Sequence, residues 1–486
     1  MDISRKVIAL APMPPEKSAY ALARYSRSPD SIEQSLRWVH EHSSERFWEQ
    51  FYFAYGHGSI ADLGHVTICF ENITELAAIH IEDEPLWDGQ AKSSRYQDFS
   101  KTGVFIPPEI KDSEFEASFV RIADRLTAAY TSFFEPINAH LLESTPRPES
   151  MVVAAYDRTM KARTLDVTRY FLPLASYTNV GQVVSIRTLE KQISRFLSSH
   201  IPELVAIGEE LVSACRSSPV NIWNELEGGN HVSNEPLAPT LARHAKAQYY
   251  YRETMADLTQ VARERVRFEQ IEPADSVELS DPHHPLDELV TTLMYRVSHY
   301  SYRQILRAVE SWPEHTKNEV VELSLRRRGP YDELLREFHS GYAFVFDILM
   351  DVGGWRDLHR HRRCQQIPQE FTTIHGYELP QEFGQAGLDT QVRETFDAVL
   401  KEINGFHDVT DTVKAYLLPF AGRMRCLFKM DFAEAEYISR LRTGVKGHAS
   451  YRRIGWLMKE RLAERHPFLG NLIEATHPDV EDTLTR

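Results

Sequence analysis

Two short landmarks recur about half a chain length apart, and this weak repeat constrains the fold more than any other feature of the sequence. Leu-Pro at 172–173 precedes Ile-Ser-Arg at 193–195, and Leu-Pro at 418–419 precedes Ile-Ser-Arg at 438–440. The offsets are 418 − 172 = 246 and 438 − 193 = 245 residues, so the register is nearly constant. Short apolar tripeptides also recur by chance, which leaves a coincidence open. A true repeat would make the chain two similar domains, and for that reason repeats are weighed before local patterns.

Two upstream segments fit the same register. Residues 70–84 and 346–362 are both interpreted as strand-like runs that lead into a dense cluster of charge. Each is followed by an extended segment that reaches proline, VFIPP in the first copy and GYELP in the second. The charge has opposite sign, since Glu82-Asp83-Glu84 stands in the first copy and Arg360-His361-Arg362 in the second. An anion held by arginines in one half would be repelled by the acidic triplet in the other, so the halves cannot be equivalent sites.

The stretch between the copies predicts a linker that contains a helix. Residues 217–285 hold two segments rich in turn and breaker residues, and these bracket a helical pattern at 241–268. We expect a first domain at 1–216 and a second domain at 286–486. Residues 31–42 are expected to open as a capped helix, with Ser31 as N-cap and Gln34 three residues on, and the segments 112–134 and 188–212 carry a helical period. Strand-like segments such as HVTICFEN are mixed with these helices, without a regular βαβ order. The predicted class is therefore α+β, with two tandem copies of a mixed or antiparallel sheet flanked by helices.

Charge and cysteine usage exclude several classes of partner. The 486 residues have a formal net charge of −15, a field that repels phosphate backbones, so we expect no nucleic-acid binding. Any phosphate site must then be a local basic cluster. The four cysteines are scattered without disulfide or zinc spacing, and no apolar run approaches the roughly 18 residues of a membrane span. The apolar run near the start is too short for a signal peptide. We expect a reduced, cytoplasmic protein without a membrane partner.

The densest cationic segment of the chain is His359-Arg360-His361-Arg362-Arg363. Guanidinium groups bind phosphate, carboxylate or a delocalised ring anion at two points, which lysine cannot do. Several within one turn repel one another unless an anion or an acidic partner lies among them. A solvated basic face and an anion site both fit this pattern. The two histidines have no third ligand nearby, so we expect no metal.

The first half carries two further candidates for binding. In Gly56-His57-Gly58-Ser59, the glycines would let backbone N–H groups approach an anionic or ring ligand closely. In Ser93-Ser94-Arg95-Tyr96, a hydroxyl, a guanidinium and a ring could bind a phosphate and cover a base. An ordinary tight turn and an ordinary surface loop fit these segments as well.

At these residues the sequence resembles the flavin-dependent thymidylate synthases, also known as thymidylate synthase complementing proteins. The family signature is Arg-His-Arg, seven further residues and a Ser that opens Ser-x-Arg-Tyr. The second copy supplies Arg360-His361-Arg362, whereas the first supplies Tyr-Gly-His-x-Ser at 55–59 and the Ser-x-Arg-Tyr segment at 93–96. Neither half has the complete signature, because the first has the acidic triplet and the second has Glu370 at the serine position.

The resemblance implies roles for individual residues. The family has a substrate-binding arginine six positions after Leu-Pro, which Arg425 matches and Asn179 does not. The catalytic residues implied are Arg360, Arg362 and Arg425. The cofactor-binding residues implied are Arg360, His361, Arg362, His57, Ser59 and Arg187. The substrate-binding residues implied are Ser93, Arg95, Tyr96, Arg425 and Arg442.

The resemblance also implies an activity. The family transfers a one-carbon unit from 5,10-methylenetetrahydrofolate to dUMP to give dTMP, with NADPH-reduced FAD as the hydride donor. We expect an FAD-dependent methyltransferase of this type, with a pyrimidine nucleotide as substrate. Two alternatives stay open: flavin-dependent alkylation of another pyrimidine nucleotide, and a non-catalytic flavin- or nucleotide-binding homologue. Because the family is tetrameric and builds sites across subunits, we expect arginines of the second half to share a site with Ser93 and Arg95. A homodimer would then resemble the four-domain assembly.

Overall fold

The computed structural model describes most of the chain, in the residues given at the end of this paragraph. Contacts group the chain into two compact units, the first made of residues 1–69, 86–89 and 181–249 and the second of 70–85, 90–180 and 250–486. Each unit is assembled from separate stretches of sequence, and the predicted domain limits at 216 and 286 remain predictions about the repeat. The described residues are 8, 10, 12–26, 28, 31–54, 58–220, 235–268, 270–280, 285–329, 332, 335–338, 344–430, 432–471, 473–480 and 484.

The first unit is mainly helical in its described residues. Helix α2 (Ile32–Glu41) begins as the sequence predicts, because the side chain of Ser31 accepts from the N–H of Gln34 and Gln34 reciprocates. The predicted helical segments after residue 186 form two helices, α8 and α9. The other helices of this unit are α1 (Pro15–Tyr25), α3 (Ser44–Phe47), the π-helix η1 (Trp48–Ala54), the 3-10 helix η2 (Gly58–Leu63), α8 (Ile186–Leu197), α9 (Pro202–Arg216) and α11 (Pro239–His244).

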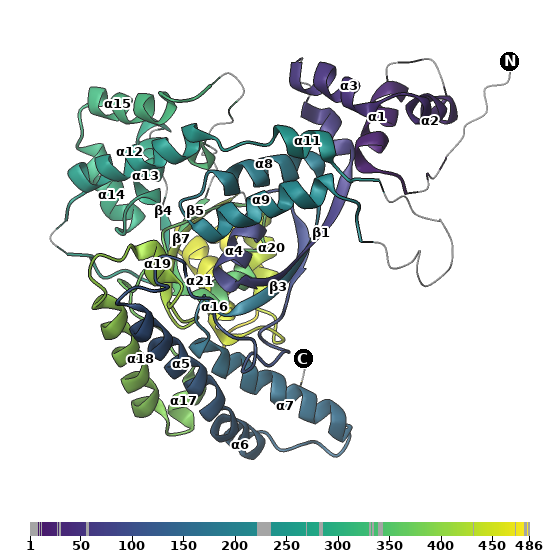
Figure 1. Cartoon of the computed structure of the whole chain (residues 1–486). Helices are drawn as coiled ribbons and strands as arrows, with labels where there is room; N and C mark the ends of the chain where they lie inside the picture. Colours follow the sequence, from purple (N-terminus) through teal and green to yellow (C-terminus); the bar gives the residue numbers. More distant parts are fainter. Residues whose placement is uncertain are drawn as a thin grey trace. The chain divides into compact units, whose positions relative to one another are not determined.

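The second unit contains a four-stranded antiparallel sheet in the order β4-β5-β7-β6. The central strands are β5 (Phe344–Asp351) and β7 (Arg423–Met430), flanked by β4 (Val277–Ser280) and β6 (Gln365–Pro368). Strand β5 is buried along its whole length, which fits its nearly continuous apolar sequence. Phe346 and Phe428 lie opposite each other in the register and are fully buried. This pair of strands forms the centre of the core of the second unit (Figure 1).

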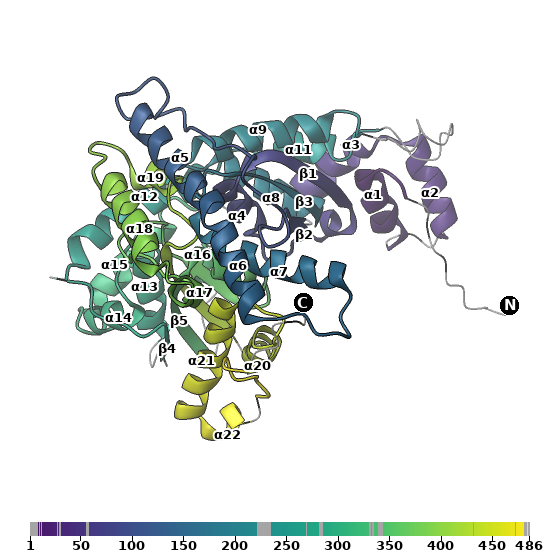
Figure 2. The same cartoon turned by 90° about the horizontal axis from the view of Figure 1, so that it is seen from below.

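Helices surround this sheet in the second unit. Helix α5, predicted from its helical periodicity, packs along α18 in both views (Figure 1, Figure 2). The guanidinium of Arg121 on α5 donates to Glu402 on α18 at 3.1 Å. The helical pattern predicted between the copies forms α12. Up to residue 265 the helices are α4 (Glu75–Glu82), α5 (Glu116–Ser132), α6 (Phe134–Ser144), α7 (Val153–Thr168), η3 (Arg169–Phe171) and α12 (Tyr249–Arg265). The later ones are α13 (Pro285–Arg296), α14 (Tyr302–Glu310), α15 (Glu314–Leu325), η4 (Arg336–Phe338), α16 (Val352–Leu358), α17 (Gln381–Gln385), α18 (Asp389–Asn404), α19 (Asp411–Ala415), α20 (Phe432–Arg442), α21 (Ala449–Arg465) and α22 (Pro467–Asn471).

A three-stranded sheet has the order β1-β3-β2, and the limits between the two units fall within its strands. Its strands are β1 (His65–Thr74), β3 (Tyr177–Ser185) and β2 (Asp88–Ala91). Burial alternates along the first part of β1, which confirms the strand predicted at HVTICFEN. With helices and small sheets in no regular βαβ order, the α+β class is confirmed. Within the described part of the chain, no helix combines the length and the apolar character needed to cross a membrane.

The strand-like interpretation of residues 70–84 and 346–362 was wrong for the second part of each segment. Strand β1 ends at Thr74 and strand β5 ends at Asp351, and a short helix follows each. The hydroxyl of Thr74 accepts from the N–H of Ala77 at 2.9 Å, and the carboxylate of Asp351 accepts from the N–H of Gly354 at 2.6 Å. These N-caps turn an apolar run into a helix. The charge clusters therefore follow α4 and α16, and not a strand.

Backbone hydrogen bonds around the two Leu-Pro landmarks repeat with a constant offset. The N–H of Leu174 donates to the carbonyl of Leu418, and the N–H of Phe420 donates to the carbonyl of Leu172, both at 3.0 Å. The two bonds exchange under one shift, since 418 − 172 = 246 and 420 − 174 = 246. The two landmarks thus lie directly against each other in the second unit, in a twofold-like arrangement.

The junctions that begin α4 and α16 repeat in the same way. The N–H of Glu75 donates to the carbonyl of Ser176 at 3.0 Å, and the N–H of Val352 donates to the carbonyl of Gly422 at 2.9 Å. The shifts are 352 − 75 = 277 and 422 − 176 = 246. The strand orders β1-β3-β2 and β5-β7-β6 match under the same correspondence. The backbone hydrogen bonds around these two junctions therefore follow one pattern even where the side chains differ.

Candidate anion-binding site

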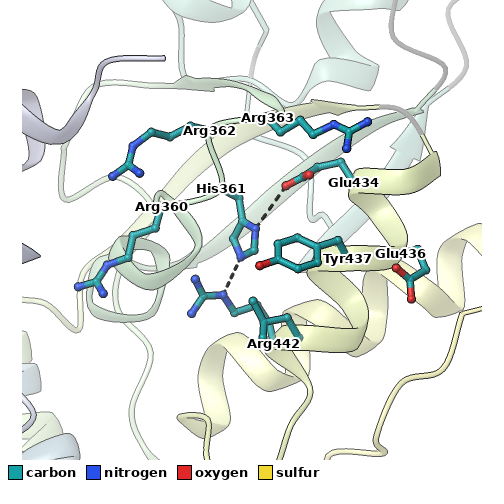
Figure 3. Close-up of a pocket in the computed structure, with 9 residues that line it drawn as sticks. Arg360, His361, Arg362, Arg363, Glu434, Glu436, Tyr437 and Arg442 are labelled. Atoms are coloured by element: carbon teal, nitrogen blue, oxygen red, sulfur yellow. Dashed lines mark hydrogen bonds and ion pairs between the residues drawn. The ribbon is translucent and has the colours of Figure 1, made fainter. Parts of the chain in front are cut away.

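A pocket of about 510 Å³ in the second unit brings together the basic segment after α16 and one face of α20 (Figure 3). Arg360 and Arg363 are exposed, whereas Arg362 is half-buried. In Figure 3 the side chains of Arg360 and Arg362 extend to one side of the loop and Arg363 extends to the other. The pocket is lined by Arg360, His361, Arg362, Arg363, Glu434, Glu436, Tyr437, Leu441 and Arg442.

The turn that presents these arginines is held by one buried amide. The side-chain nitrogen of Gln366 donates to the carbonyl of His361 at 2.8 Å, and to those of Leu358 and His359 at 3.3 Å. Leu358 ends α16, and His359 and His361 follow it, so the amide binds carbonyls at and just after the end of the helix. Gln366 therefore fixes the backbone after α16, and the arginine side chains project from a rigid turn.

His361 connects the basic segment to α20. The Nε–H of Arg442 donates to His361 Nε2 at 2.7 Å, while His361 Nδ1 lies 3.3 Å from a carboxylate oxygen of Glu434. Burial lowers the pKa of His361. The guanidinium groups of Arg442 and Arg362 lower it further, and the carboxylate of Glu434 raises it by less than these effects together. The ring is therefore neutral at pH 7, with its proton on Nδ1 and its lone pair on Nε2. A neutral His361 thus orients Arg442 at the pocket.

The pocket has an excess of positive charge. Its lining contains four arginines and two glutamates, and its histidine is neutral, which leaves two charges more than the carboxylates balance. Tyr437 and Leu441 add exposed apolar surface, with 44% and 47% of their areas accessible. Such a lining fits an anion that carries a flat ring, because guanidinium groups bind phosphate oxygens and an aromatic side chain covers a ring.

The acidic triplet of the first half lies beside this basic segment within the second unit. A carboxylate oxygen of Asp83 is 3.2 Å from His359 Nε2 and accepts from the guanidinium of Arg336 at 2.7 Å. Glu82 and Glu84 line a small cavity together with Asp83 and Arg362. The sequence interpretation required an anion or an acidic partner among the clustered cations, and Asp83 is an acidic partner of His359 in this segment.

Arg95 reaches the same region from the first half of the chain. Its guanidinium binds both carboxylate oxygens of Asp166, at 2.7 and 3.1 Å, and donates to the hydroxyl of Tyr451 at 3.3 Å. The guanidinium of Arg442 lies over the ring of the same tyrosine, 5.7 Å from its centroid. Tyr451 therefore contacts one arginine from each half of the sequence.

Asp357 is the carboxylate at the centre of this arrangement. Burial opposes its ionisation, but the facing guanidinium groups of Arg169, Arg95, Arg360 and Arg442 outweigh burial and lower the pKa of Asp357. Arg169 is 3% exposed, lies 3.8 Å from Asp357 and donates to the hydroxyl of Ser94 at 3.4 Å. The loop at 93–96 and the basic segment at 360–363 are thus neighbours within one chain.

Sequence spacing did not identify every residue at this place. Asp166, Arg169 and Tyr451 each contact residues far away in the sequence, and no local pattern marks them. Glu434 lies eight residues, about two helical turns, before Arg442 on α20, so the helical period around that arginine could have identified it.

The other predicted residues that the structure describes do not line this pocket. Arg425 lies on β7, is 2% exposed and is bound to Asp347 at 2.7 Å, so it does not line the pocket and its predicted substrate-binding and catalytic roles receive no support. Ser93 accepts from the N–H of Arg95 at 3.3 Å, and the ring of Tyr96 is 58% exposed.

Three predicted cofactor residues belong to the first unit. His57 lies outside the described residues, and the side chain of Ser59 is likewise not described. Arg187, on α8, donates to the carboxylate of Asp62 at 3.0 Å. The roles of these three residues stay predictions.

Comparison with known families and curated proteins gives three findings. Residues 7–204 match the family model of the thymidylate synthase complementing proteins, which confirms the resemblance seen in the sequence motifs. A UPF0159 protein of Chlamydia muridarum is 24% identical over 437 residues, which cover 87% of this chain and 79% of the relative. A UPF0159 protein of Thermoplasma acidophilum is 22% identical over 497 residues, covering 93% of this chain and 94% of the relative. These alignments extend over both halves of the chain.

Solved structures give a more distant similarity. A flavin-dependent thymidylate synthase of Helicobacter pylori, crystallised with FAD and dUMP, is 12% identical with a TM-score of 0.26 and covers 46% of this chain and 96% of its own. A second structure of the enzyme from this organism, also with FAD and dUMP, is 15% identical with a TM-score of 0.28 and covers 41% of this chain and 88% of its own.

Proposed function

We propose that this chain, related through residues 7–204 to the thymidylate synthase complementing proteins, is an FAD-dependent thymidylate synthase. The proposed reaction transfers a one-carbon unit from 5,10-methylenetetrahydrofolate to dUMP, with NADPH as the reductant of the flavin. One observation carries the proposal. Arg360, Arg362 and Arg442 of the second half line the pocket. Arg95 of the first half lies close to them, because it shares Tyr451 with Arg442 and Asp357 with Arg360 and Arg442.

The donor set of the pocket fits FAD and a nucleotide phosphate. Arg360 and Arg362 extend to the same side of their turn, where they would bind the pyrophosphate or the ring carbonyls of the flavin. Arg442, held by neutral His361, and Arg95, held by Asp166, would bind the phosphate of the pyrimidine nucleotide. The flavin, when bound, supplies the hydride chemistry, and the protein orients the partners and stabilises negative charge on the rings.

We further propose that the chain is a tandem duplication with one site per chain. The exchange of hydrogen bonds between the Leu-Pro landmarks under a shift of 246 residues supports two copies of one backbone. The proposed site uses cations of the second copy and the loop at 93–96 of the first. A second such site would need an arginine in the first copy at the position of Arg360. The residue there is Asp83, since 360 − 277 = 83, and it is negatively charged. A homodimer would hold two sites and resemble the four-domain family assembly.

A second candidate function is the flavin-dependent alkylation of another pyrimidine nucleotide. Asp357 favours it, because an ionised carboxylate among the arginines can accept from an exocyclic amino group, which uracil lacks and cytosine has. A non-catalytic flavin- or nucleotide-binding role is the third possibility, motivated by the acidic triplet at 82–84.

Genetic complementation tests the proposed activity most directly. Expression of this chain should restore growth of a thymidine-requiring bacterial strain, and the purified protein should be yellow. Release of the C5 proton of dUMP should require both NADPH and methylenetetrahydrofolate. A yellow protein that releases no such proton but converts another pyrimidine nucleotide would favour the second candidate. A colourless protein without thermal stabilisation by FAD would contradict both enzyme functions.

A further inference from the structure

Helix α20 ends at Arg442, and the residue that follows it is held from two directions within the second unit. Thr443 is fully buried, and its hydroxyl donates to the carbonyl of Ser439 in the last turn of the helix at 2.7 Å. The same hydroxyl accepts from the N–H of Thr476 at 3.0 Å, although the two threonines are 476 − 443 = 33 residues apart. The segment 473–480, which follows α22, thus reaches back to the end of α20.

One buried guanidinium makes the second connection. Arg452 lies on α21 and is 4% exposed, and its Nε–H donates to the carbonyl of Thr443 at 3.1 Å. One of its terminal nitrogens donates to the carbonyls of His477 and Val480, at 3.4 and 2.7 Å. Carbonyls at the end of a helix lack intrahelical partners, so the guanidinium supplies donors where the chain needs them. Arg452 therefore ties the segment 473–480 to the end of α20.

Close packing of α21 on α20 reinforces this connection. The two helices lie side by side in the second unit (Figure 2). A β-carbon at Gly455 would lie 3.4 Å from Arg442 Cβ, so α21 passes close to the base of that side chain. Arg452 and Gly455 are three residues apart and share one face of α21. Beside them, the ring of Trp456 contacts that of His477, with the ring centroids 4.7 Å apart.

The side chain of Arg442 leads from this junction to the pocket. Its Nε–H donates to His361 Nε2, as Figure 3 shows, and its guanidinium lies over the ring of Tyr451. Tyr451 directly precedes Arg452 on α21. The head of the Arg442 side chain is thus oriented by His361 and Tyr451, while the main chain at its base is fixed through Thr443. A shift of Thr443 would move that base away from both contacts.

We propose that Arg452 and the segment 473–480 position Arg442 for the phosphate of the nucleotide. Arg452 is a positioning residue, since it acts through the main chain of Thr443 and does not line the pocket. The effect on the nucleotide rests on the proposed function. The dependence of Arg442 on this segment rests only on the hydrogen bonds of Arg452 and Thr443.

Calorimetric titration of the full-length protein with dUMP tests the proposal. Arg452→Met keeps an unbranched side chain but removes the donors, and it should weaken dUMP binding by about fivefold. FAD affinity should change by less than about twofold, because Arg360 and Arg362 leave a different turn, which Gln366 holds. Arg452→Lys restores one cationic donor without the fork of the guanidinium, so it should recover part of the dUMP affinity.

A matched pair of substitutions at Thr476 tests the segment separately. Thr476→Pro removes the N–H that donates to Thr443, whereas Thr476→Ala keeps it. The first should weaken dUMP binding by about threefold and the second by less than about 1.5-fold. Asp479→Asn changes a side chain of the same segment that is 90% exposed, and it should leave the affinity unchanged. If Arg452→Met does not fold by circular dichroism, the pair at Thr476 provides the comparison.

A measurement without ligand separates this proposal from the proposed function. Burial has the largest effect on the pKa of His361 and lowers it, and Arg442 lowers it further against the carboxylate of Glu434. Displacement of Arg442 should therefore raise the pKa of His361. An NMR titration, with the imidazole signal assigned by its loss in His361→Gln, should show this rise in Arg452→Met and Thr476→Pro but not in Thr476→Ala.

Two results would overturn the proposal. Folded Arg452→Met protein that keeps the wild-type pKa of His361 would show that Arg442 does not depend on this contact. A loss of dUMP affinity that is equally large in an Arg442→Gln background would show that Arg452 acts elsewhere, because residues that act through each other are non-additive. Wild-type protein that binds no dUMP would contradict the proposed function, and the His361 titration would then decide the positioning by itself.

Discussion

The loops that follow α4 and α16 leave equivalent places in the backbone and carry opposite charge. Asp83 and Arg360 correspond under the shift of 277 residues that relates the two helices. Among the described residues, Asp83 of the acidic triplet contacts His359 and Arg336 of the second half, whereas the basic segment lines the pocket. The difference teaches that similar backbone hydrogen bonding does not require similar chemistry.

The largest expected effect of this difference is on flavin binding. Arg362→Ala removes a guanidinium from the pocket and should weaken FAD by about 3 kcal/mol, roughly 100-fold, as expected for a charge-assisted hydrogen bond. Glu82→Ala changes the acidic triplet and should alter FAD affinity by less than about twofold. Flavin fluorescence quenching measures both. Equal and severe losses would contradict unequal halves.

A somewhat smaller effect is expected on nucleotide binding from the first half. Arg95→Gln should weaken dUMP by about 1.5–3 kcal/mol, roughly 10- to 100-fold, because it removes a charge-assisted contact that Asp166 holds in place. Isothermal titration with dUMP measures the change. Arg121→Gln, which changes an exposed arginine on α5, serves as the matched control. If the two variants bind dUMP equally, the first half contributes no substrate arginine.

The histidine that orients Arg442 should have a more moderate influence. His361→Phe keeps a ring at this position but removes the acceptor for Arg442 Nε, which should weaken dUMP by about 1 kcal/mol, roughly fivefold. His361→Gln retains an acceptor and should recover part of the loss. If both variants fold and His361→Gln binds dUMP no better than His361→Phe, His361 acts only through packing.

The smallest effect is a difference in acid stability between the loop at 92–103 and the loop at 369–376. His375 has an unfolded pKa near 6.5 and a folded pKa of about 3, so the unfolded chain binds more protons between these values. Its contribution to stability is complete above pH 6.5 and is lost as the pH falls toward 3. The loop at 92–103 contains no histidine. His375→Asn should therefore reduce the slope of unfolding midpoint against pH below 6.5, and an unchanged slope in a thermal scan would contradict this assignment.

Local patterns in the sequence predicted the elements better than the contacts between them. The capping box at Ser31 and the alternating strand at 65–72 follow from residues that are neighbours in the sequence, and both were predicted. The helices α4 and α16 were missed because the apolar, β-branched lead-in resembles a strand until Thr74 or Asp351 caps a helix. Cap residues decided between two structures that the apolar pattern alone allowed.

The candidate site could be predicted only in part for the same reason. The cluster at Arg360–Arg363 is visible as a dense run of charge, and its pocket partner Arg442 came from the family resemblance. Asp166 and Tyr451, which hold Arg95, lie 71 and 356 positions from it, and such contacts depend on tertiary packing. Arg425 was likewise identified by the family resemblance, which does not reveal its partner Asp347 on the adjacent strand.

The number of flavins bound per chain tests the shared, cationic site most directly. Purified protein saturated with FAD should hold one flavin per chain, and dUMP should perturb its absorption spectrum in wild type but not in Arg95→Gln. Two flavins per chain, or a flavin that Arg362→Ala binds with wild-type affinity, would contradict a single site built from both halves.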